Sequence, residues 1–390
     1  MALIFARYLT EARLVELAAV VCCLHPAKRR AQLARGTLDV LGLERVPVAV
    51  GTDGGDARGD QEAPDPEDYD YVPNDGSARA TELSAGRTLL RRTLEAAAPR
   101  SLVVCVISSL KDAALFLRDN EALFVAKVRE VSIMGGVKTA APSPGDLLEP
   151  DSAHNNQFDV DASKFFYRRC QELGVRLVVV GRAAAYDVPV PRGVYDDLAL
   201  LGSPIGWRLR DAQRDAIDGL WRRAAAAGDE RRGLPARCDR RWFGKTFCGA
   251  EDAVADREKD ASVWDLVTSF NMYDTLGLIG AVPALRDALF APVEFRAPGA
   301  AATAAPHLLV GVADDAPGFA SAEARDACRA LLRDAYRTGL LLDHSARARV
   351  VLAVPGGAAV ALAVLRSLVE FEAAVPVGVV AGTDAVLRSL

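Results

Sequence analysis

The sequence predicts an α/β fold with an open, mostly parallel sheet that carries helices on both faces. Two observations predict this class. Short β-branched runs, such as residues 176–180 (RLVVV), recur along the chain and are separated by amphipathic helical segments. The runs are continuously apolar, without a polar residue at every second position, and this is typical of parallel strands that helices cover on both faces.

The expected elements follow one another in alternating order. Helices are predicted near 2–15, 27–42, 81–97, 110–128 and 159–173, and strands near 17–24, 46–50, 102–107, 131–134 and 176–180. Residues 204–262 are mostly helical and highly charged, which we interpret as a helical layer or lid. A linker rich in Pro, Ala and Gly then precedes another strand–helix run. We therefore expect one domain at 1–290 and a C-terminal α/β extension at 291–390.

The composition excludes several classes of protein. The net charge of -5 argues against a dedicated nucleic-acid surface, which would normally be basic. No uninterrupted apolar stretch is long enough to span a membrane, and charged residues interrupt the N-terminus where a signal peptide would be apolar. The seven cysteines are scattered, without metal-ligand spacing. We expect a cytoplasmic protein that acts on a small molecule, with homo-oligomerisation left open.

A glycine pair marks the first candidate site. Residues 132–136 (SIMGG) end an apolar strand, and about twenty residues later 153–159 (AHNNQFD) enter a helix. Glycines lack a Cβ and let the backbone approach a ligand, while amide side chains can bind sugar hydroxyls. Ligands of open α/β sheets lie at such strand ends. An ordinary strand-to-helix connection with solvated asparagines explains the same pattern.

Two familiar nucleotide and hydrolase motifs are absent. Residues 51–55 (GTDGG) follow a strand but enter an acidic segment, where phosphate would be repelled, so they are no dinucleotide fingerprint. That segment, 53–70, lacks the ligand spacing of a calcium loop and is interpreted as a surface loop. No Gly-x-Ser-x-Gly elbow suggests a serine hydrolase.

Four motifs in the same order make residues 1–290 resemble the inosine–uridine-preferring nucleoside hydrolases. They are residues 1–6 (MALIFA), 46–51 (VPVAVG), 133–136 (IMGG) with the asparagines that follow, and 271–274 (NMYD). The resemblance implies a nucleoside hydrolase-like sheet and calcium-dependent hydrolysis of the N-glycosidic bond of purine or pyrimidine ribonucleosides. The alternative is a non-catalytic relative that binds a nucleoside or ribose.

The resemblance also assigns substrate-binding residues. Met134 matches a methionine that borders the ribose in the family. Asn155 matches the ribose-contacting asparagine, and Asn156 is the alternative if the register shifts by one residue. These three residues are the expected substrate contacts.

The implied metal and catalytic residues depart further from the family pattern. Asp274 matches the calcium-ligating aspartate of the C-terminal motif, and a helix cap is its other interpretation. Lys111 stands where the family offers a backbone carbonyl to Ca²⁺. Tyr273 replaces the histidine that protonates the leaving base, and its high intrinsic pKa makes it a weak acid.

Both ends of the chain also depart from the family. The aspartate cluster and first strand expected before Met1 are absent from the sequence, which favours a truncated or degenerate member. Residues 349–362 echo that opening strand, glycine turn and helix without the aspartates, and a further strand follows at 375–380. The echo is interpreted as a degenerate second copy, as a segment that fills the vacant strand position, or as a generic strand–helix unit.

Overall fold

A nine-stranded sheet forms the centre of the fold. The computed structural model describes residues 1–55, 69–231, 234, 236–301 and 303–341, together with the backbone of 375–381. Across the sheet, the strands are β3 (Ser84–Ala85), β2 (Val48–Val50), β1 (Val15–Cys22), β11 (Val375–Ala381), β4 (Leu102–Val106), β5 (Val128–Met134), β6 (Arg176–Val180), β10 (His307–Val310) and β9 (Val293–Phe295). Strands β10 and β9 are antiparallel, and the other neighbours are parallel. The predicted fold class is confirmed.

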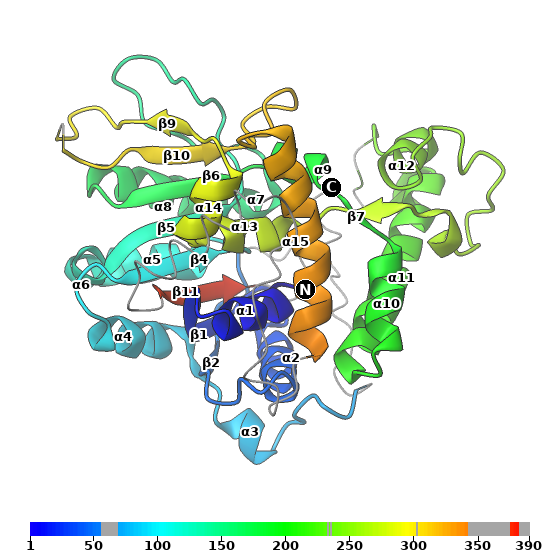
Figure 1. Ribbon diagram of the computed structural model, residues 1–390, viewed down its shortest axis with the longest axis horizontal. Helices are drawn as coiled ribbons and strands as arrows, with labels where there is room; N and C mark the ends of the chain where they lie inside the picture. The colour runs from blue at the N-terminus through cyan, green and yellow to red at the C-terminus, as the bar shows by residue number, and fades with distance from the viewer. Residues whose placement is uncertain (56–68, 232–233, 235, 302, 342–374, 382–390) are drawn as a thin grey trace. The chain divides into compact units, whose positions relative to one another are not determined.

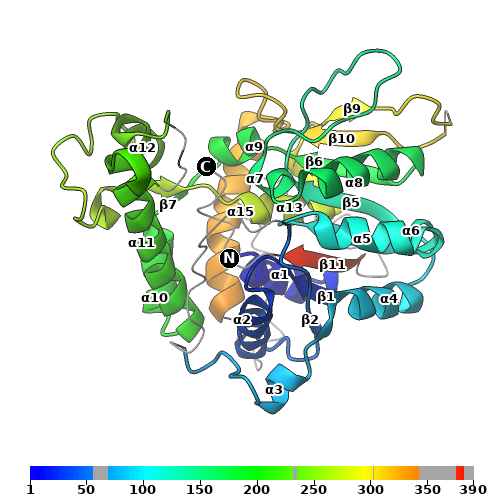
Figure 2. The same cartoon turned by 180° about the vertical axis from the view of Figure 1, so that it is seen from behind.

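Helices cover both faces of this sheet (Figures 1 and 2). One face carries α4 (Gly86–Ala96), α5 (Lys111–Asp119), α6 (Glu121–Lys127) and α8 (Val160–Glu172). The other face carries α1 (Ala2–Glu11), α2 (Ala27–Val40), α13 (Tyr273–Ala281), α14 (Pro283–Leu289) and α15 (Ala322–Leu341). Short helices are α3 (Ala78–Thr81), α7 (His154–Gln157) and α9 (Arg182–Asp187). Within the described ranges, no helix combines the length and hydrophobicity that a membrane span requires.

The apolar runs of the sequence form strands because both of their faces are buried. Val104 and Val106 of β4, with Val131 and Ile133 of β5, pack in one core against α4, α5, α6 and α8. Intervening residues such as Cys105 are equally buried and lie on the opposite side of the strand. Each strand therefore contributes apolar surface to two helical layers, which explains its lack of alternation.

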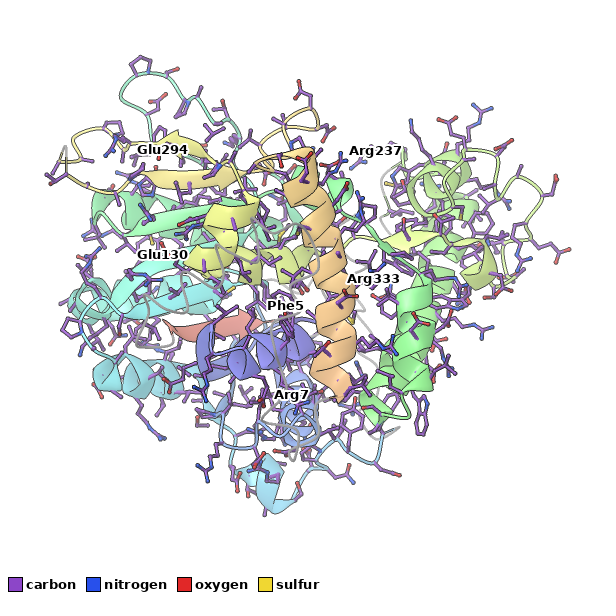
Figure 3. The ribbon with its side chains drawn as sticks, viewed as in Figure 1. Phe5, Arg7, Glu130, Arg237, Glu294 and Arg333 are labelled. Atoms are coloured by element: carbon purple, nitrogen blue, oxygen red, sulfur yellow. The ribbon has the colours of Figure 1, made fainter. Side chains whose placement is uncertain are left out.

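Helices α1 and α15 bring distant parts of the chain together on the second face. Figure 3 labels Phe5 and Arg7 on α1. The Arg7 guanidinium donates a hydrogen bond of 2.9 Å to the carbonyl of Gly339 on α15. The rings of Phe5 and Tyr336 meet edge to face at 6.4 Å, and the Tyr336 hydroxyl lies 2.6 Å from the Thr275 hydroxyl on α13. These contacts fix α13, which carries a candidate site residue, against α1 and α15.

The C-terminal strand β11 lies in the middle of the sheet, between β1 and β4 (Figure 1). Val379 is opposite Val20 on one side and Cys105 on the other. The strand predicted at 375–380 is thus confirmed, and its position joins strands β3-β2-β1 to strands β4-β5-β6-β10-β9. The echo segment 349–362 lies outside the described residues.

The chain divides into two compact units at 188/189 and 271/272, and not at residue 290. Unit 1 contains residues 1–188 and 272–389, so β9, β10 and β11 belong to the same sheet as the earlier strands. Unit 2 spans 189–271. Its strands are β7 (Val190–Pro191) and β8 (Ser269–Phe270), and its α-helices are α10 (Gly193–Leu200), α11 (Pro204–Ala225) and α12 (Arg240–Phe247). Two short 3₁₀ helices lie at Gly228–Arg231 and Trp264–Leu266.

Aromatic side chains form the core of unit 2. The rings of Trp221 and Phe243 lie 5.2 Å apart, and the Trp221 indole donates a hydrogen bond of 3.0 Å to the carbonyl of Glu258. The Arg240 guanidinium lies 4.9 Å above the Trp221 ring, a cation–π contact. The charged helical region predicted at 204–262 is therefore a separate packed unit with its own aromatic core.

Replacing Val379 by proline tests the position of β11. Proline lacks the backbone N–H and is excluded from central strands, so Val379→Pro should lower the free energy of unfolding by about 3 kcal/mol or more. The matched control is Val379→Thr, which keeps both the N–H and a β-branched side chain. Urea unfolding measures both variants, and equal stability of the proline and threonine variants would show that β11 does not pair with two neighbours.

A buried histidine joins β10 to β6. The backbone N–H of Leu177 donates a hydrogen bond of 3.0 Å to Nδ1 of His307. Burial, aided by the Arg176 charge, lowers the pKa of His307 from 6.5 to about 4. Protonation at Nδ1 would remove the acceptor that Leu177 needs, so the folded chain favours the neutral ring.

The His307 pKa predicts a pH-dependent stability. Because the folded pKa lies below the unfolded value, the stabilisation is complete above pH 6.5 and is lost as the pH falls toward 4. The loss should approach roughly 3 kcal/mol over this interval. His307→Asn offers Leu177 an oxygen that does not titrate, and it should flatten the stability profile between these pH values. An unchanged slope in urea unfolding would contradict this account.

Candidate functional site

The candidate site lies where the parallel strands of unit 1 end. The carboxyl ends of neighbouring parallel strands meet at one edge of a sheet, so the loops after β2, β4, β5 and β6 lie at the same edge. Met134 is the last residue of β5, and Lys111 begins the helix that follows β4. The predicted site residues Met134 and Lys111 thus lie beside the ends of neighbouring strands at this edge.

Two asparagines close the glycine turn after β5. Nδ2 of Asn155 donates a hydrogen bond of 2.9 Å to the Met134 carbonyl, and Nδ2 of Asn156 donates one of 3.1 Å to the Gly136 carbonyl. Asn156 also donates to the Asp151 carboxylate at 3.0 Å and is 1% exposed. The structure therefore brings Met134, Asn155 and Asn156 together, and the amides hold the turn in shape.

Asn155 and Asn156 each keep a side-chain oxygen without a hydrogen-bond partner among the described residues, and they differ in burial. The side chain of Asn155 is 8% exposed, and its Oδ1 accepts no hydrogen bond from the described residues. Asn156 lies deeper, with Ser163 donating a hydrogen bond of 2.9 Å to its carbonyl. Of the two alternatives, Asn155 is the better placed to accept a hydrogen bond from a ligand.

The side chain of Lys111 is engaged in an ion pair. Its ammonium lies 3.1 Å from Oδ2 of Asp159, whose Oδ1 also caps α8 by accepting a hydrogen bond of 2.9 Å from the Ala162 N–H. Lys111 is the first residue of α5, and a carbonyl at that position normally accepts a hydrogen bond within its own helix. The implied role of this carbonyl in binding Ca²⁺ stays a prediction.

Asp274 places a buried carboxylate beyond the ends of β4 and β5. A Cβ on Gly277 would lie 2.9 Å from the Ile107 side chain and 3.2 Å from that of Met134, so α13 packs directly on these strand ends. Asp274 is one helical turn earlier in α13, 9% exposed, and its Oδ1 has no partner among the described residues. Burial raises the pKa of Asp274 to about 7, against the opposing charge of the Met1 amine.

Tyr273 lies beside Asp274 at the start of α13. Its side chain is 6% exposed, and its ring packs against Tyr186 edge to face with 6.2 Å between the centroids. The packing gives this tyrosine a place in the core of unit 1. Its implied role as a proton donor stays a prediction.

Thr52 and Asp112 tie two loops of the edge together, and the sequence analysis missed both. The backbone N–H of Thr52 donates to both oxygens of Asp112 at 2.9 and 3.1 Å, and its hydroxyl donates to Oδ2 at 2.7 Å. Burial raises the pKa of Asp112, although the hydrogen bonds from Thr52 oppose the shift. The available signals in the sequence were a threonine shortly after β2 and an acid in the first turn of α5, the helix after β4.

Comparisons with known proteins identify two similar effector structures. The type III effector protein XopQ, solved in complex with adenosine diphosphate ribose, is 29% identical, with a TM-score of 0.67 over 87% of this chain and 89% of its own. The effector protein XOO4466 is 28% identical, with a TM-score of 0.65 over the same shares. No protein-family model and no curated protein matches the chain.

A nucleoside hydrolase also aligns, at much lower similarity. The purine-preferring ribonucleoside hydrolase from Gardnerella vaginalis is 14% identical over 87% of this chain and 95% of its own, with a TM-score of 0.49. That similarity is too low for the chemistry of the hydrolase to be transferred to this chain.

A substitution at Gly51 tests the hydrogen bonds between Thr52 and Asp112. A Cβ at Gly51 would lie 2.8 Å from Oδ1 of Asp112, so Gly51→Ala forces the carboxylate away from Thr52. We expect a loss of about 1–3 kcal/mol in stability, measured by urea unfolding. The control is Gly219→Ala in α11, where an added Cβ meets nothing within 4 Å and should stabilise the helix. An unchanged free energy of unfolding in Gly51→Ala would refute the close approach of Gly51 to the Asp112 carboxylate.

Proposed function

We propose that the carboxyl edge of the sheet binds a ribose-containing nucleotide of the ADP-ribose class. The observation that carries the proposal is the similarity to XopQ, which was solved with adenosine diphosphate ribose and aligns over most of both chains. The site geometry supports it, because this edge carries polar groups suited to sugar hydroxyls.

Asp274 and Asn155 are the proposed ribose contacts. A buried carboxylate oxygen without a partner is costly, and a sugar hydroxyl that donates to it would remove that cost. Oδ1 of Asn155 can accept from a second hydroxyl, because its amide nitrogen is already held by the Met134 carbonyl. Met134, which is 5% exposed, would border the sugar with its apolar side chain.

Calcium-dependent hydrolysis of a ribonucleoside is the second candidate, supported by the family motifs around Met134 and Asp274. Calcium in proteins usually has six to eight oxygen ligands, several of them from carboxylates. Among the residues that the structure describes, no three His, Cys, Asp or Glu side chains gather as a metal site. The donors of the described residues therefore do not fit Ca²⁺.

Asp274→Asn tests the proposed ribose contact. The amide keeps the shape of the side chain but removes the charged acceptor, so the affinity for ADP-ribose should fall roughly tenfold or more. Isothermal titration calorimetry measures the affinity. The control is Asp146→Asn, an exposed acid on the loop after β5, which should bind as the wild type does.

The same titration separates the two candidates. Binding of ADP-ribose in the presence of a calcium chelator supports the proposal, and equal affinity of Asp274→Asn and wild type would defeat the assigned contact. Release of free base from inosine or uridine only when Ca²⁺ is added would favour the hydrolase.

A further inference from the structure

One backbone carbonyl at the candidate site accepts three hydrogen bonds. The carbonyl of Gly136 accepts from the Asp151 N–H at 3.1 Å and from Nδ2 of Asn156 at 3.1 Å. The Tyr167 hydroxyl donates a third hydrogen bond of 3.2 Å to the same oxygen. A carbonyl oxygen has two lone pairs, so three donors use its whole capacity. The glycine turn after β5 is therefore held at this one atom by three separate groups.

Helix α8 supplies two of the side chains that hold this region. Ser163 and Tyr167 are both 0% exposed and lie four residues apart, so they face the same side of the helix. Ser163 donates a hydrogen bond of 2.9 Å to the Asn156 carbonyl in α7, while Tyr167 reaches the Gly136 carbonyl. Tyr167 also packs in the hydrophobic core between α8 and the sheet. The core of unit 1 thus anchors both α7 and the glycine turn.

A glycine at position 135 leaves room for the tyrosine hydroxyl beside the turn. A Cβ on Gly135 would lie 3.1 Å from the Tyr167 hydroxyl oxygen and 3.2 Å from Oδ1 of Asn156. Burial raises the pKa of Tyr167, and the charge of Asp151 raises it further. The hydroxyl therefore stays protonated and able to donate its hydrogen bond.

Asn155 depends on this arrangement for its position. It lies in α7, a helix of only four residues, and a single hydrogen bond joins its side chain to the Met134 carbonyl. Both partners of that hydrogen bond adjoin anchored residues, because Met134 is two residues before Gly136 and Asn155 directly precedes Asn156. A group that is held in place before the ligand arrives loses less freedom on binding. Loosening the anchors should therefore weaken a ligand that binds to Asn155.

We propose that Tyr167 is a positioning residue for the ribose, which acts through Gly136 and Asn156 to hold Oδ1 of Asn155 where a sugar hydroxyl can donate to it. The inference rests on the proposed function and adds a residue that is buried beneath the ligand contacts. Because Tyr167 has no exposed surface, its effect on affinity must pass through the residues that it holds.

Tyr167→Phe tests this role, with ADP-ribose as the probe. Calorimetry is carried out at a temperature where circular dichroism shows each variant to be folded. Loss of one of the three donors should loosen the turn and lower the affinity roughly threefold to tenfold. In an Asn155→Ala background the same change should cause no further loss, because the residue through which Tyr167 acts is gone. A tyrosine that only stabilised the fold would leave the affinity of the folded variant unchanged.

Tyr195→Phe is the matched control. Tyr195 is 1% exposed in unit 2, and its hydroxyl has no hydrogen-bond partner among the described residues, so this change should leave the affinity for ADP-ribose unaltered. Ser163→Ala removes the other anchor on α8 and should also lower the affinity. It tests the same arrangement without altering the packing of an aromatic ring.

Hydrogen exchange of the ligand-free protein gives a second measurement. Residues 151–157 should exchange faster in Tyr167→Phe than in the wild type, whereas Tyr195→Phe should leave their exchange unchanged. This result does not depend on which ligand the site binds.

The outcomes separate the positioning role from the proposed function. If the wild type binds ADP-ribose and Tyr167→Phe binds it equally well, or loses as much affinity in the Asn155→Ala background, the positioning role is refuted and the proposed function stands. If the wild type does not bind ADP-ribose, the proposed function fails. Exchange of residues 151–157 then decides the role of Tyr167, which unchanged exchange would overturn and faster exchange would support.

Discussion

The pairing of β11 with β1 and β4 is the constraint on which the rest of the structure depends. Every buried backbone N–H and carbonyl needs a partner, and the inner edges of β1 and β4 find theirs on this one strand. Strands β3-β2-β1 and strands β4-β5-β6-β10-β9 would otherwise be two separate sheets with open edges. The hydrogen bonds between Thr52 and Asp112 cross this junction, so the loop after β2 meets the start of α5 only when the two halves are joined.

Polar side chains at this edge differ in whether their hydrogen-bonding atoms already have partners in the protein. Both oxygens of Asp112 accept hydrogen bonds, and the amide nitrogen of Asn156 donates to the Gly136 carbonyl and to Asp151, so these groups hold loops in place. Asp274 is 9% exposed and keeps an oxygen without a partner in the described residues, and so does the Asn156 side chain at its Oδ1. A satisfied buried group stabilises the fold, whereas an unsatisfied one is costly until a ligand binds. Between the two buried carboxylates Asp112 and Asp274, this contrast favours Asp274 as the centre of the proposed site.

Local patterns predict the strands and helices of this chain but not the order of the strands. The run at 375–380 is recognisably a strand, because it is apolar and β-branched, yet nothing in it indicates β1 and β4 as its neighbours. The division at 188 and 271 was missed for the same reason, since the linker at 297–306 looks like a boundary while β10 returns to the sheet. Pairing and domain membership depend on contacts between residues far apart in sequence.

The glycine pair at a strand end indicates the region of the candidate site, and the resemblance to a family assigns Met134 and Asn155 within it. Asp274 was found through resemblance to a family motif, and the structure adds that α13 packs on the ends of β4 and β5. Thr52 and Asp112 were missed because they are sixty residues apart and become partners only in the folded sheet. Hydrogen exchange of residues 375–381 tests the central claim most directly. A central strand should exchange as slowly as β4, whereas fast exchange of 375–381 beside a protected β4 would contradict the account.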